Sequence, residues 1–158
     1  MVRYAEERDL PRVNELRCQV NELHSAGRPD IFRAGFCREL QERAYTLRCG
    51  EDSDVIVAER DGVVCGMALV EYLHREESPY CCAREIYHII EFGVDEAFRR
   101  RGVGRELMDF LEAEARKKGF SGIELDMWTF NEEARKFYEA VGFKTFRLFM
   151  ERKLGGGE

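Results

Sequence analysis

Residues 94–105 read Val94-Asp95-Glu96-Ala97-Phe98-Arg99-Arg100-Arg101-Gly102-Val103-Gly104-Arg105, and they join a predicted strand to a predicted helix. Gly102 and Gly104 carry no side chain where the chain turns, so several backbone N–H groups can point outward together. The N-terminus of the helix adds partial positive charge, and the arginines add full charges. This pattern predicts a binding site for an anionic group such as a pyrophosphate.

Two other phosphate-binding loops do not fit this segment. A Walker A loop requires Gly-x-x-x-x-Gly-Lys-Ser/Thr, which the sequence does not contain. The dinucleotide fingerprint requires a third glycine or alanine where this chain has Leu107, and it follows the first strand of a parallel sheet. Taken alone, the segment also fits a basic turn with two glycines that begin a helix.

The pattern on both sides of this loop predicts a mixed sheet flanked by helices. The apolar residues recur at helical spacing in four places and form strand-like runs in six. We expect strands at 2–5, 55–58, 63–73, 85–94, 123–128 and 143–153, and helices that begin near residues 9, 36, 102 and 131.

The composition is that of one globular domain. The chain has 158 residues, of which 44% are hydrophobic, and we expect a single domain over residues 1–154 with a flexible tail at 155–158. A net charge of -6 argues against nucleic acid as a partner. The sequence has no signal segment and no apolar run of the roughly 20 residues that span a bilayer, so we expect a cytoplasmic protein without membrane contact.

The six cysteines do not form a metal-binding pattern. None of them forms a CxxC pair, and the adjacent Cys81 and Cys82 are poorly spaced to hold one zinc ion. We therefore expect no metal site and reduced thiols.

Residues 86–143 resemble the signature of the GCN5-related N-acetyltransferase (GNAT) superfamily. Its acyl-CoA loop reads Arg/Gln-x-x-Gly-x-Gly/Ala, and Arg99, Gly102 and Gly104 match it. A second motif of the family has asparagine, alanine, Phe-Tyr and Gly-Phe in that order. This chain has Asn131, Ala134, Phe137-Tyr138 and Gly142-Phe143. Two motifs in the right order are far more specific than either alone, although the first 85 residues match the family only loosely.

This resemblance implies a fold and a cofactor. The fold is an α/β (α+β) GNAT fold, with a central, mixed, mostly antiparallel twisted sheet of six to seven strands. About four helices flank the sheet, and its fourth and fifth strands splay apart. The cofactor is acetyl-CoA, a co-substrate. Its binding residues would be Phe92, Val94, Arg99, Arg100, Arg101, Gly102, Val103, Gly104, Arg105 and Asn131.

The resemblance also implies catalytic residues. A tyrosine at the position of Tyr138 protonates the departing CoA thiolate, and a phenol is a reasonable acid for that task. The base is less clear. His88 occupies the place where some members carry a glutamate, and an imidazole ordinarily titrates near neutrality. Glu91 is the alternative, with Glu85 third. Strict alternation puts Glu91 and His88 on opposite faces of the strand, unless a bulge intervenes.

By resemblance, the loop between the first two helices borders the acceptor pocket, although this segment also fits an ordinary interhelical turn. Arg28 would hold a carboxylate or phosphate, and Asp30 an ammonium group. The other candidate pocket residues are His24, Phe32, Tyr72 and Trp128. Acidic and aromatic side chains together suit a small amine.

We therefore expect an acetyl-CoA-dependent N-acetyltransferase that acetylates a primary amine of a small molecule by direct attack in a ternary complex. A peptide or protein Nα-acetyltransferase and a non-catalytic acyl-CoA-binding module carry the same motifs and stay open as alternatives. The apolar residues Phe146, Leu148 and Phe149 of the expected last strand fit either the core of the chain or a homodimer contact.

Overall fold

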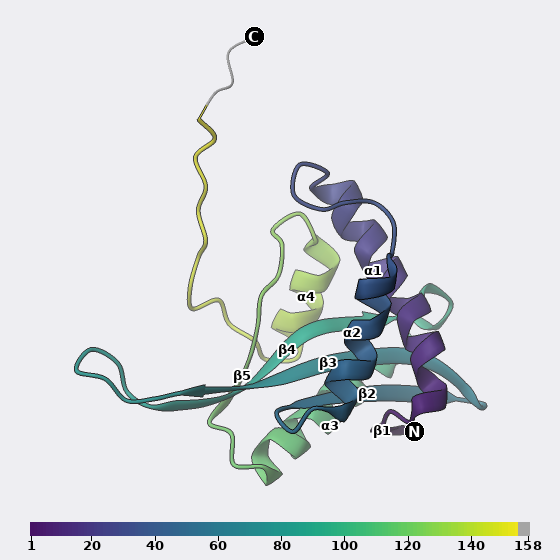
Figure 1. Cartoon of the computed structure of the whole chain (residues 1–158), viewed down its shortest axis with the longest axis horizontal. Helices are drawn as coiled ribbons and strands as arrows, with labels where there is room; N and C mark the ends of the chain where they lie inside the picture. Colours follow the sequence, from purple (N-terminus) through teal and green to yellow (C-terminus); the bar gives the residue numbers. More distant parts are fainter. Residues whose placement is uncertain (155–158) are drawn as a thin grey trace.

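The computed structural model describes residues 1–154 as alternating helices and strands around one sheet (Figure 1). It has five strands, four α-helices and two short 3₁₀ turns at Glu7–Asp9 and Glu96–Phe98. In chain order the longer elements are β1 (Val2–Tyr4), α1 (Leu10–Gly27), α2 (Arg38–Cys49), β2 (Ser53–Arg60), β3 (Val63–Arg75), β4 (Arg84–Val94), α3 (Val103–Lys117), β5 (Gly122–Leu125) and α4 (Glu132–Ala140).

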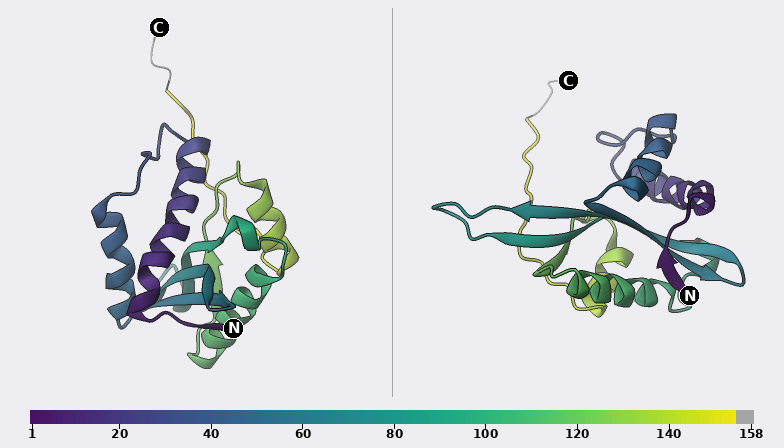
Figure 2. Two further views of the ribbon diagram at one scale, coloured as in Figure 1. Left: turned by 90° about the vertical axis from the view of Figure 1, so that its right-hand side faces the viewer. Right: turned by 60° about the horizontal axis from the view of Figure 1, so that its bottom comes forward.

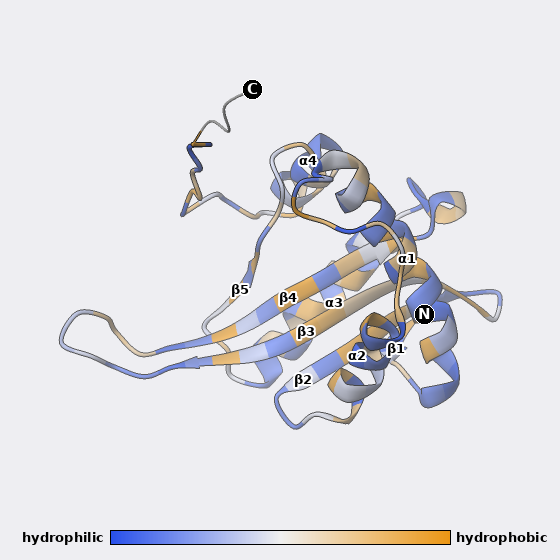
Figure 3. Cartoon of the chain, turned by 45° about the horizontal axis from the view of Figure 1, so that its top comes forward, coloured by the Kyte–Doolittle hydropathy of each residue, from blue (hydrophilic) through white to orange (hydrophobic). Residues whose placement is uncertain are grey.

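The sheet has the order β1-β2-β3-β4-β5, and only its last pair is parallel. Helices α1 and α2 cover one face, and α3 and α4 cover the other (Figure 2). Strand β2 therefore buries both faces: Ile56 and Ala58 pack under α3, whereas Val55 and Val57 pack under α1. This two-sided burial explains the continuous apolar runs in the sequence, and Figure 3 shows them as hydrophobic bands along the middle strands.

The expected last strand does not form. Residues 143–154 contain no strand, so the described sheet has five strands where we predicted six to seven. The apolar pattern of this segment is that of a strand, but a strand needs a neighbour to accept and donate its backbone hydrogen bonds. Within residues 1–154 no neighbouring strand supplies them. The tail expected at 155–158 lies outside the described residues.

A bulge in β4 changes which residues share a face. Leu69 pairs with Glu91 but the next residue of β3, Val70, pairs with Ile89, so Ile90 is an extra residue in β4. Beyond it, Glu91 points to the α1 face, as His88 does before it. Strict alternation, which would put them on opposite faces, does not hold here, and the bulge that we named as the exception is the reason.

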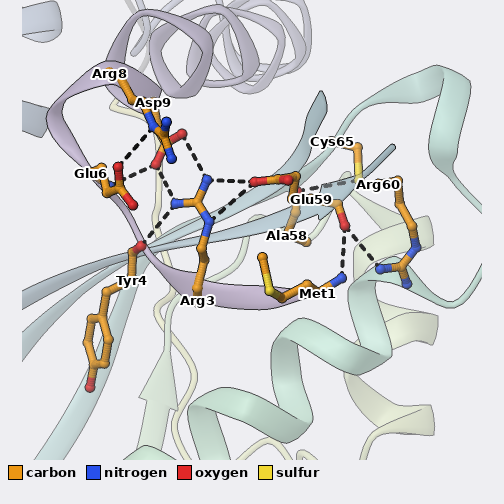
Figure 4. A network of polar contacts seen from close by, with 10 residues as sticks. All are labelled: Met1, Arg3, Tyr4, Glu6, Arg8, Asp9, Ala58, Glu59, Arg60 and Cys65. Carbon is orange, nitrogen blue, oxygen red and sulfur yellow. Dashed lines mark hydrogen bonds and ion pairs between the residues drawn. The ribbon is translucent and has the colours of Figure 1, made fainter. Parts of the chain in front are cut away.

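An ionic network fixes the start of the chain against the sheet (Figure 4). The Arg3 guanidinium donates to the Asp9 carboxylate at 2.6 Å and to Glu59 on β2 at 2.7 Å. The hydrogen bonds from Arg3 lower the pKa of Asp9 below its ordinary value. This network ties β1 and the start of α1 to β2, and α1 is then held over the face of the sheet where Glu91 lies.

None of the helices in residues 1–154 combines the length and the apolar character that crossing a lipid bilayer requires.

Candidate functional site

Asp95 sets the direction in which the chain leaves β4. Its backbone N–H donates to the Cys65 carbonyl at 2.9 Å, and its side chain accepts a hydrogen bond from the Ala97 N–H at 2.9 Å. Arg12 of α1 also pairs with the Asp95 carboxylate. Because Asp95 is buried and held from three sides, the loop that follows starts from a fixed point.

The two glycines of the loop are needed for different reasons. Gly102 has φ of 81°, a left-handed conformation that favours glycine, and the space beside it is open. Gly104 has an ordinary backbone, but a Cβ there would lie 3.2 Å from the ring of Phe137 on α4. Gly102 therefore allows the turn, whereas Gly104 lets α4 pack closely against the start of α3.

The loop presents a row of free backbone donors. Within the described residues, the N–H groups of residues 100–105 have no hydrogen-bond acceptor in the protein. Arg100 and Gly102 both have positive φ, which turns successive N–H groups in one direction. Together with the N-terminus of α3, this arrangement fits an anion with several oxygens, such as a pyrophosphate.

Two of the loop arginines hold the loop itself. Arg99 Nε donates to the Val94 carbonyl at 3.2 Å, and Arg105 donates to the Ala140 carbonyl at 3.2 Å. Arg101 lies over the ring of Phe98, at 5.7 Å from its centroid. These three arginine side chains are therefore engaged within the protein, whereas the backbone N–H groups of residues 100–105 are not.

Strands β4 and β5 separate next to this loop. Their parallel pairing ends where Ile89 lies opposite Leu125, so the last residues of β4 have no strand on that side. Phe92 and Val94 lie in this unpaired part, and both pack toward α3 and α4. Their backbone groups are available to an extended ligand that lies in the opening. This matches the expected splay between the fourth and fifth strands.

Asn131 and Tyr138 of the second motif lie at the start and near the end of α4. The Asn131 side chain accepts a hydrogen bond from the Ala134 N–H at 3.1 Å, so it caps the helix. The Tyr138 ring lies 6.1 Å from the ring of Phe92, beside the opening. Burial alone raises the pKa of Tyr138 to about 12, and within residues 1–154 no hydrogen bond of its hydroxyl contributes to that shift. The hydroxyl is therefore protonated at neutral pH and able to donate a hydrogen bond.

His88 lies in the part of β4 that still pairs with β5, between two carboxylates. Its Nδ1 lies 3.0 Å from Glu71 Oε1, and its Nε2 lies 3.7 Å from Asp126. Because a carboxylate only accepts, Nδ1 carries the proton in that contact. In this tautomer the lone pair is on Nε2, the nitrogen that faces Asp126.

Glu91 is held by a buried arginine. Arg17 of α1 is only 1% exposed, and it donates to both Glu91 oxygens at 2.8 Å. Arg17 also donates to Asn14 at 3.0 Å and lies over the ring of Phe36. Both Glu91 oxygens are therefore occupied, which favours a positioning role for Glu91 over that of a base.

Four aromatic side chains meet where the end of α1 faces the segment after β5. His24 stacks on Phe32 with ring centroids 5.0 Å apart, and Phe32 meets Trp128 edge-on at 5.1 Å. Phe130 stacks on Trp128 at 6.3 Å. A Cβ on Gly27 would lie 2.3 Å from the Phe130 ring, so the ring can occupy this position only because residue 27 has no side chain. Burial lowers the pKa of His24, which keeps its ring neutral.

The sequence analysis did not single out Phe130. The signal for it was its spacing of two residues from Trp128, just before the Asn131 cap.

The other expected acceptor residues are Arg28, Asp30 and Tyr72. Arg28 adjoins the aromatic group, because its guanidinium lies 5.7 Å from the centroid of the Trp128 ring. Arg28 and Asp30 bind each other through two hydrogen bonds of 2.8 Å, so neither charge is free for a ligand. A shallow hollow of about 880 Å³ lies next to them on residues 22–34. Tyr72 lies on the α3 face, where its hydroxyl donates to Asp54 at 2.6 Å and its ring packs on Tyr87. Tyr72 is therefore not brought together with His24, Phe32 and Trp128.

Comparisons with known proteins find a family model and relatives that match this chain. A model of the family described as "Acetyltransferase (GNAT) family" matches residues 18–143. Among curated proteins, the "Uncharacterized N-acetyltransferase YycN" of Bacillus subtilis (strain 168) is 33% identical over 66 residues, which span 42% of this chain and 42% of that protein. The match thus covers less than half the length of this relative.

Solved structures match over almost the whole chain. The tetramutant of the BH1408 protein from Bacillus halodurans is 28% identical with a TM-score of 0.93, and the match covers 98% of this chain and 99% of that one. Aminoglycoside N-acetyltransferase AAC(6')-Iy, solved in complex with CoA, is 21% identical with a TM-score of 0.77, and the match covers 98% and 95% of the two chains. The second similarity concerns the fold alone.

Proposed function

The chain belongs to the acetyltransferase (GNAT) family, and from this membership we propose that it transfers the acetyl group of acetyl-CoA to a primary amine of a small molecule. The proposed unit is a single acyl-CoA N-acyltransferase domain over residues 1–154. The observation that carries the proposal is the row of free N–H groups at residues 100–105, next to the opening between β4 and β5.

The residues present fit acetyl-CoA in two respects. The free N–H groups and the N-terminus of α3 match the charge of a pyrophosphate. The unpaired backbone of β4 near Phe92 and Val94 matches an amide-containing arm that hydrogen-bonds like an added strand. In this proposal Asn131 lies at the far side of the same opening, where its capped side chain keeps its NH₂ group free to donate.

The proposed reaction is a direct attack. Acetyl-CoA, when bound, supplies an acetyl group as a thioester. The neutral amine nitrogen forms a bond to the acetyl carbon, and the bond from that carbon to sulfur breaks. His88 accepts the proton that the amine loses, and Tyr138 donates its hydroxyl hydrogen toward the leaving sulfur. No covalent enzyme intermediate is needed.

The His88 assignment rests on its carboxylate partner. A hydrogen bond from Nδ1 to Glu71 fixes the ring and supports the positive charge that appears when Nε2 takes a proton. Glu91 has both oxygens bound by Arg17, so we propose that it holds the bulge of β4 in place. Of the two base candidates, His88 is therefore the one we favour.

The acceptor is proposed to bind where the aromatic side chains His24, Phe32, Trp128 and Phe130 meet. Aromatic faces attract cationic amines. Asp126 and Glu71 next to His88 add negative charge on the same approach. Because Arg28 and Asp30 neutralise each other, we do not propose that they select the acceptor directly.

A thiol-release assay tests the proposed function. Purified protein is supplied with acetyl-CoA and, separately, a polyamine, an aminoglycoside, free amino acids and a peptide with a free N-terminus. We expect saturable CoA release with at least one small amine. Release only with the peptide would replace the proposal by an Nα-acetyltransferase. Saturable acetyl-CoA binding with no release from any amine would instead indicate a binding module.

Replacing His88 by glutamine is expected to lower kcat/KM for the amine by about 10- to 100-fold at pH 7, because a positioned base contributes at least that much. Glutamine keeps a polar group near Glu71 but cannot take a proton. Affinity for acetyl-CoA, measured by calorimetry, should not change. The matched control is His74→Gln, because His74 pairs with Glu85 at the exposed end of β3. Equal rates in the two variants would rule out His88 as the base.

A further inference from the structure

Arg17 is the most deeply buried charged residue in the part of the chain that the structure describes, and no step of the proposed reaction uses it. A buried guanidinium destabilises a fold unless its donors are paired. Its Nε and Nη2 donate to the two oxygens of Glu91 on β4. Its Nη1 donates to Asn14 Oδ1 and to the carbonyl of Leu40 on α2. The centroid of the Phe36 ring lies 5.1 Å from its Cζ. One side chain therefore joins α1, α2 and β4.

The side of α1 that carries this arginine continues to the proposed acceptor site. Four residues of α1 follow one another at spacings of three or four positions and so share one side of the helix: Arg17, Val20, His24 and Gly27. Val20 packs directly on β4, because a Cβ on Gly93 would lie only 3.1 Å from its Cγ2. His24 and Gly27 contact the aromatic side chains where we propose that the acceptor binds. The position of α1 on β4 therefore sets how far this acceptor group, His24, Phe32, Trp128 and Phe130, lies from the opening beside β4.

The connection between α1 and α2, residues 28–37, is tied to the same guanidinium. It carries Phe32 of the acceptor group, and four residues later Phe36 lies against Arg17. Leu40, one turn beyond, accepts a hydrogen bond from Arg17 through its carbonyl. Arg17 thus links both α1 and the connection, the two segments that supply His24 and Phe32, to one carboxylate of β4.

We propose that Arg17 is a positioning residue for the acceptor: its bonds to Glu91 and Leu40 hold the acceptor group in a fixed place relative to the unpaired part of β4. This inference rests on the proposed acetyl transfer, and Arg17 itself touches neither substrate. The role requires the planar fork of a guanidinium, because three nitrogens donate in different directions. A lysine would keep the charge but offer a single nitrogen.

A double replacement separates positioning from stability alone. Removing Arg17 by itself leaves Glu91 without its partner, which destabilises the fold. Replacing both charges by apolar residues of similar size often leaves stability unchanged or raises it. We therefore expect Arg17→Met to melt roughly 6–20 °C lower than the wild type, and Arg17→Met/Glu91→Leu to melt within about 4 °C of it. If Arg17 only stabilised the fold, the double variant would also behave as the wild type at the acceptor group.

Fluorescence of Trp128 reports on the acceptor group directly. Trp128 is the only tryptophan of the chain, and its ring is half-buried among the other members of the group. Acrylamide quenches an indole only on contact. We expect acrylamide to quench Trp128 more strongly in Arg17→Met/Glu91→Leu than in the wild type, because the group is no longer held. Wild-type quenching in a stably folded double variant would overturn the proposal. This measurement needs no amine, so it decides the role of Arg17 even if the wild type acetylates none and the proposed function fails.

Kinetics give a second, independent readout. We expect the double variant to have a KM for the amine at least about 10-fold higher, with kcat and the affinity for acetyl-CoA little changed, because a loosened pocket loses binding and not a reacting group. An unchanged KM would contradict the proposal. A collapse of kcat would instead indicate that Glu91 is the base, against both this inference and the assignment of His88.

The matched control makes the same exchange at another ion pair, Arg3→Met/Glu59→Leu, at the other end of α1. It should leave the quenching of Trp128 and the KM at their wild-type values, and an equal rise in the control would overturn the proposal. Arg17→Lys keeps the charge beside Glu91 and serves if the double variant does not fold. We expect it to show the same rise in quenching, because one nitrogen cannot replace the fork. Wild-type quenching in Arg17→Lys would show that the charge alone suffices, against the proposal.

Discussion

Replacing Gly102 by valine is expected to weaken acetyl-CoA binding by at least about 100-fold. Gly102 has φ of 81°, and nothing in the protein lies within 4 Å of the place where a Cβ would be. Its neighbours on the loop carry the free N–H groups that we propose bind the pyrophosphate. A branched side chain would occupy the space of the ligand and strain the turn at the same time.

The size of this effect follows from the bonds that would be lost. A hydrogen bond from a backbone N–H to a charged oxygen contributes about 1.5–3 kcal/mol. Loss of two such bonds therefore costs at least about 3 kcal/mol, which is slightly more than 100-fold in affinity. Calorimetric titration with acetyl-CoA measures it directly, with NAD titrated in parallel as a ligand that neither protein should bind.

Gly119→Val is the matched control. Gly119 lies just beyond the other end of α3, has φ of 84° and also has open space around it. Both variants therefore carry the same backbone strain and should lose similar thermal stability, but only Gly102→Val should lose affinity. If the two variants bind acetyl-CoA equally well, or lose binding to the same extent, the loop is not the pyrophosphate site.

The loop and the order of elements could be predicted because their signals are local. A glycine with positive φ, an asparagine cap and a helix that ends at basic residues each depend on a few adjacent residues. The four helices and the first five strands accordingly appear where the sequence placed them, with shifts of a few residues at the ends.

The features that were missed depend on partners far away in the sequence. Alternation along β4 could not show that Ile90 is an extra residue, because a bulge exists only relative to the pairing of β3. Tyr72 was expected among the acceptor residues, but the pleat of β3 turns it to the α3 face, toward Asp54. Residues 143–153 have the pattern of a strand, and pattern alone does not show whether a neighbouring strand is available.

The sequence also does not show which charged side chains pair with each other. The sequence offered Glu91 as a candidate base, but it did not show that Arg17, 74 positions earlier, binds both its oxygens. Arg28 and Asp30 are only two positions apart, and there too the side chains bind each other. Roles can therefore be assigned to candidate residues only when their contacts are known. Here the contacts favour His88 over Glu91 as the base.

Replacing Tyr138 by phenylalanine is expected to lower kcat by about 100-fold and to leave the affinity for acetyl-CoA unchanged. The ring packs beside Phe92 and Phe143, so phenylalanine keeps the packing and removes only the hydroxyl. General acids contribute about 10²- to 10⁴-fold. We expect the lower end of this range because of the pKa of this tyrosine.

Burial raises the pKa of Tyr138 to about 12, whereas a thiol has a pKa near 8.5. Full transfer of the proton to a free thiolate would thus be unfavourable by about 3.5 units, or about 5 kcal/mol. Tyr138 consequently acts mainly by donating a hydrogen bond as negative charge develops on sulfur. Burial also keeps the hydroxyl protonated, so its contribution should be the same at every pH up to about 11.

The measurement is kcat for the wild-type protein and for Tyr138→Phe between pH 6 and pH 10, with Tyr45→Phe on α2 as the control for loss of a hydroxyl elsewhere. The ratio of wild-type to Tyr138→Phe rates should stay near 100 throughout, and the Tyr45→Phe rates should match the wild type. A ratio that falls toward one between pH 8 and pH 10 would mean that the hydroxyl ionises there, against the raised pKa. A ratio of one at every pH would mean that water, or another donor, protonates the leaving sulfur.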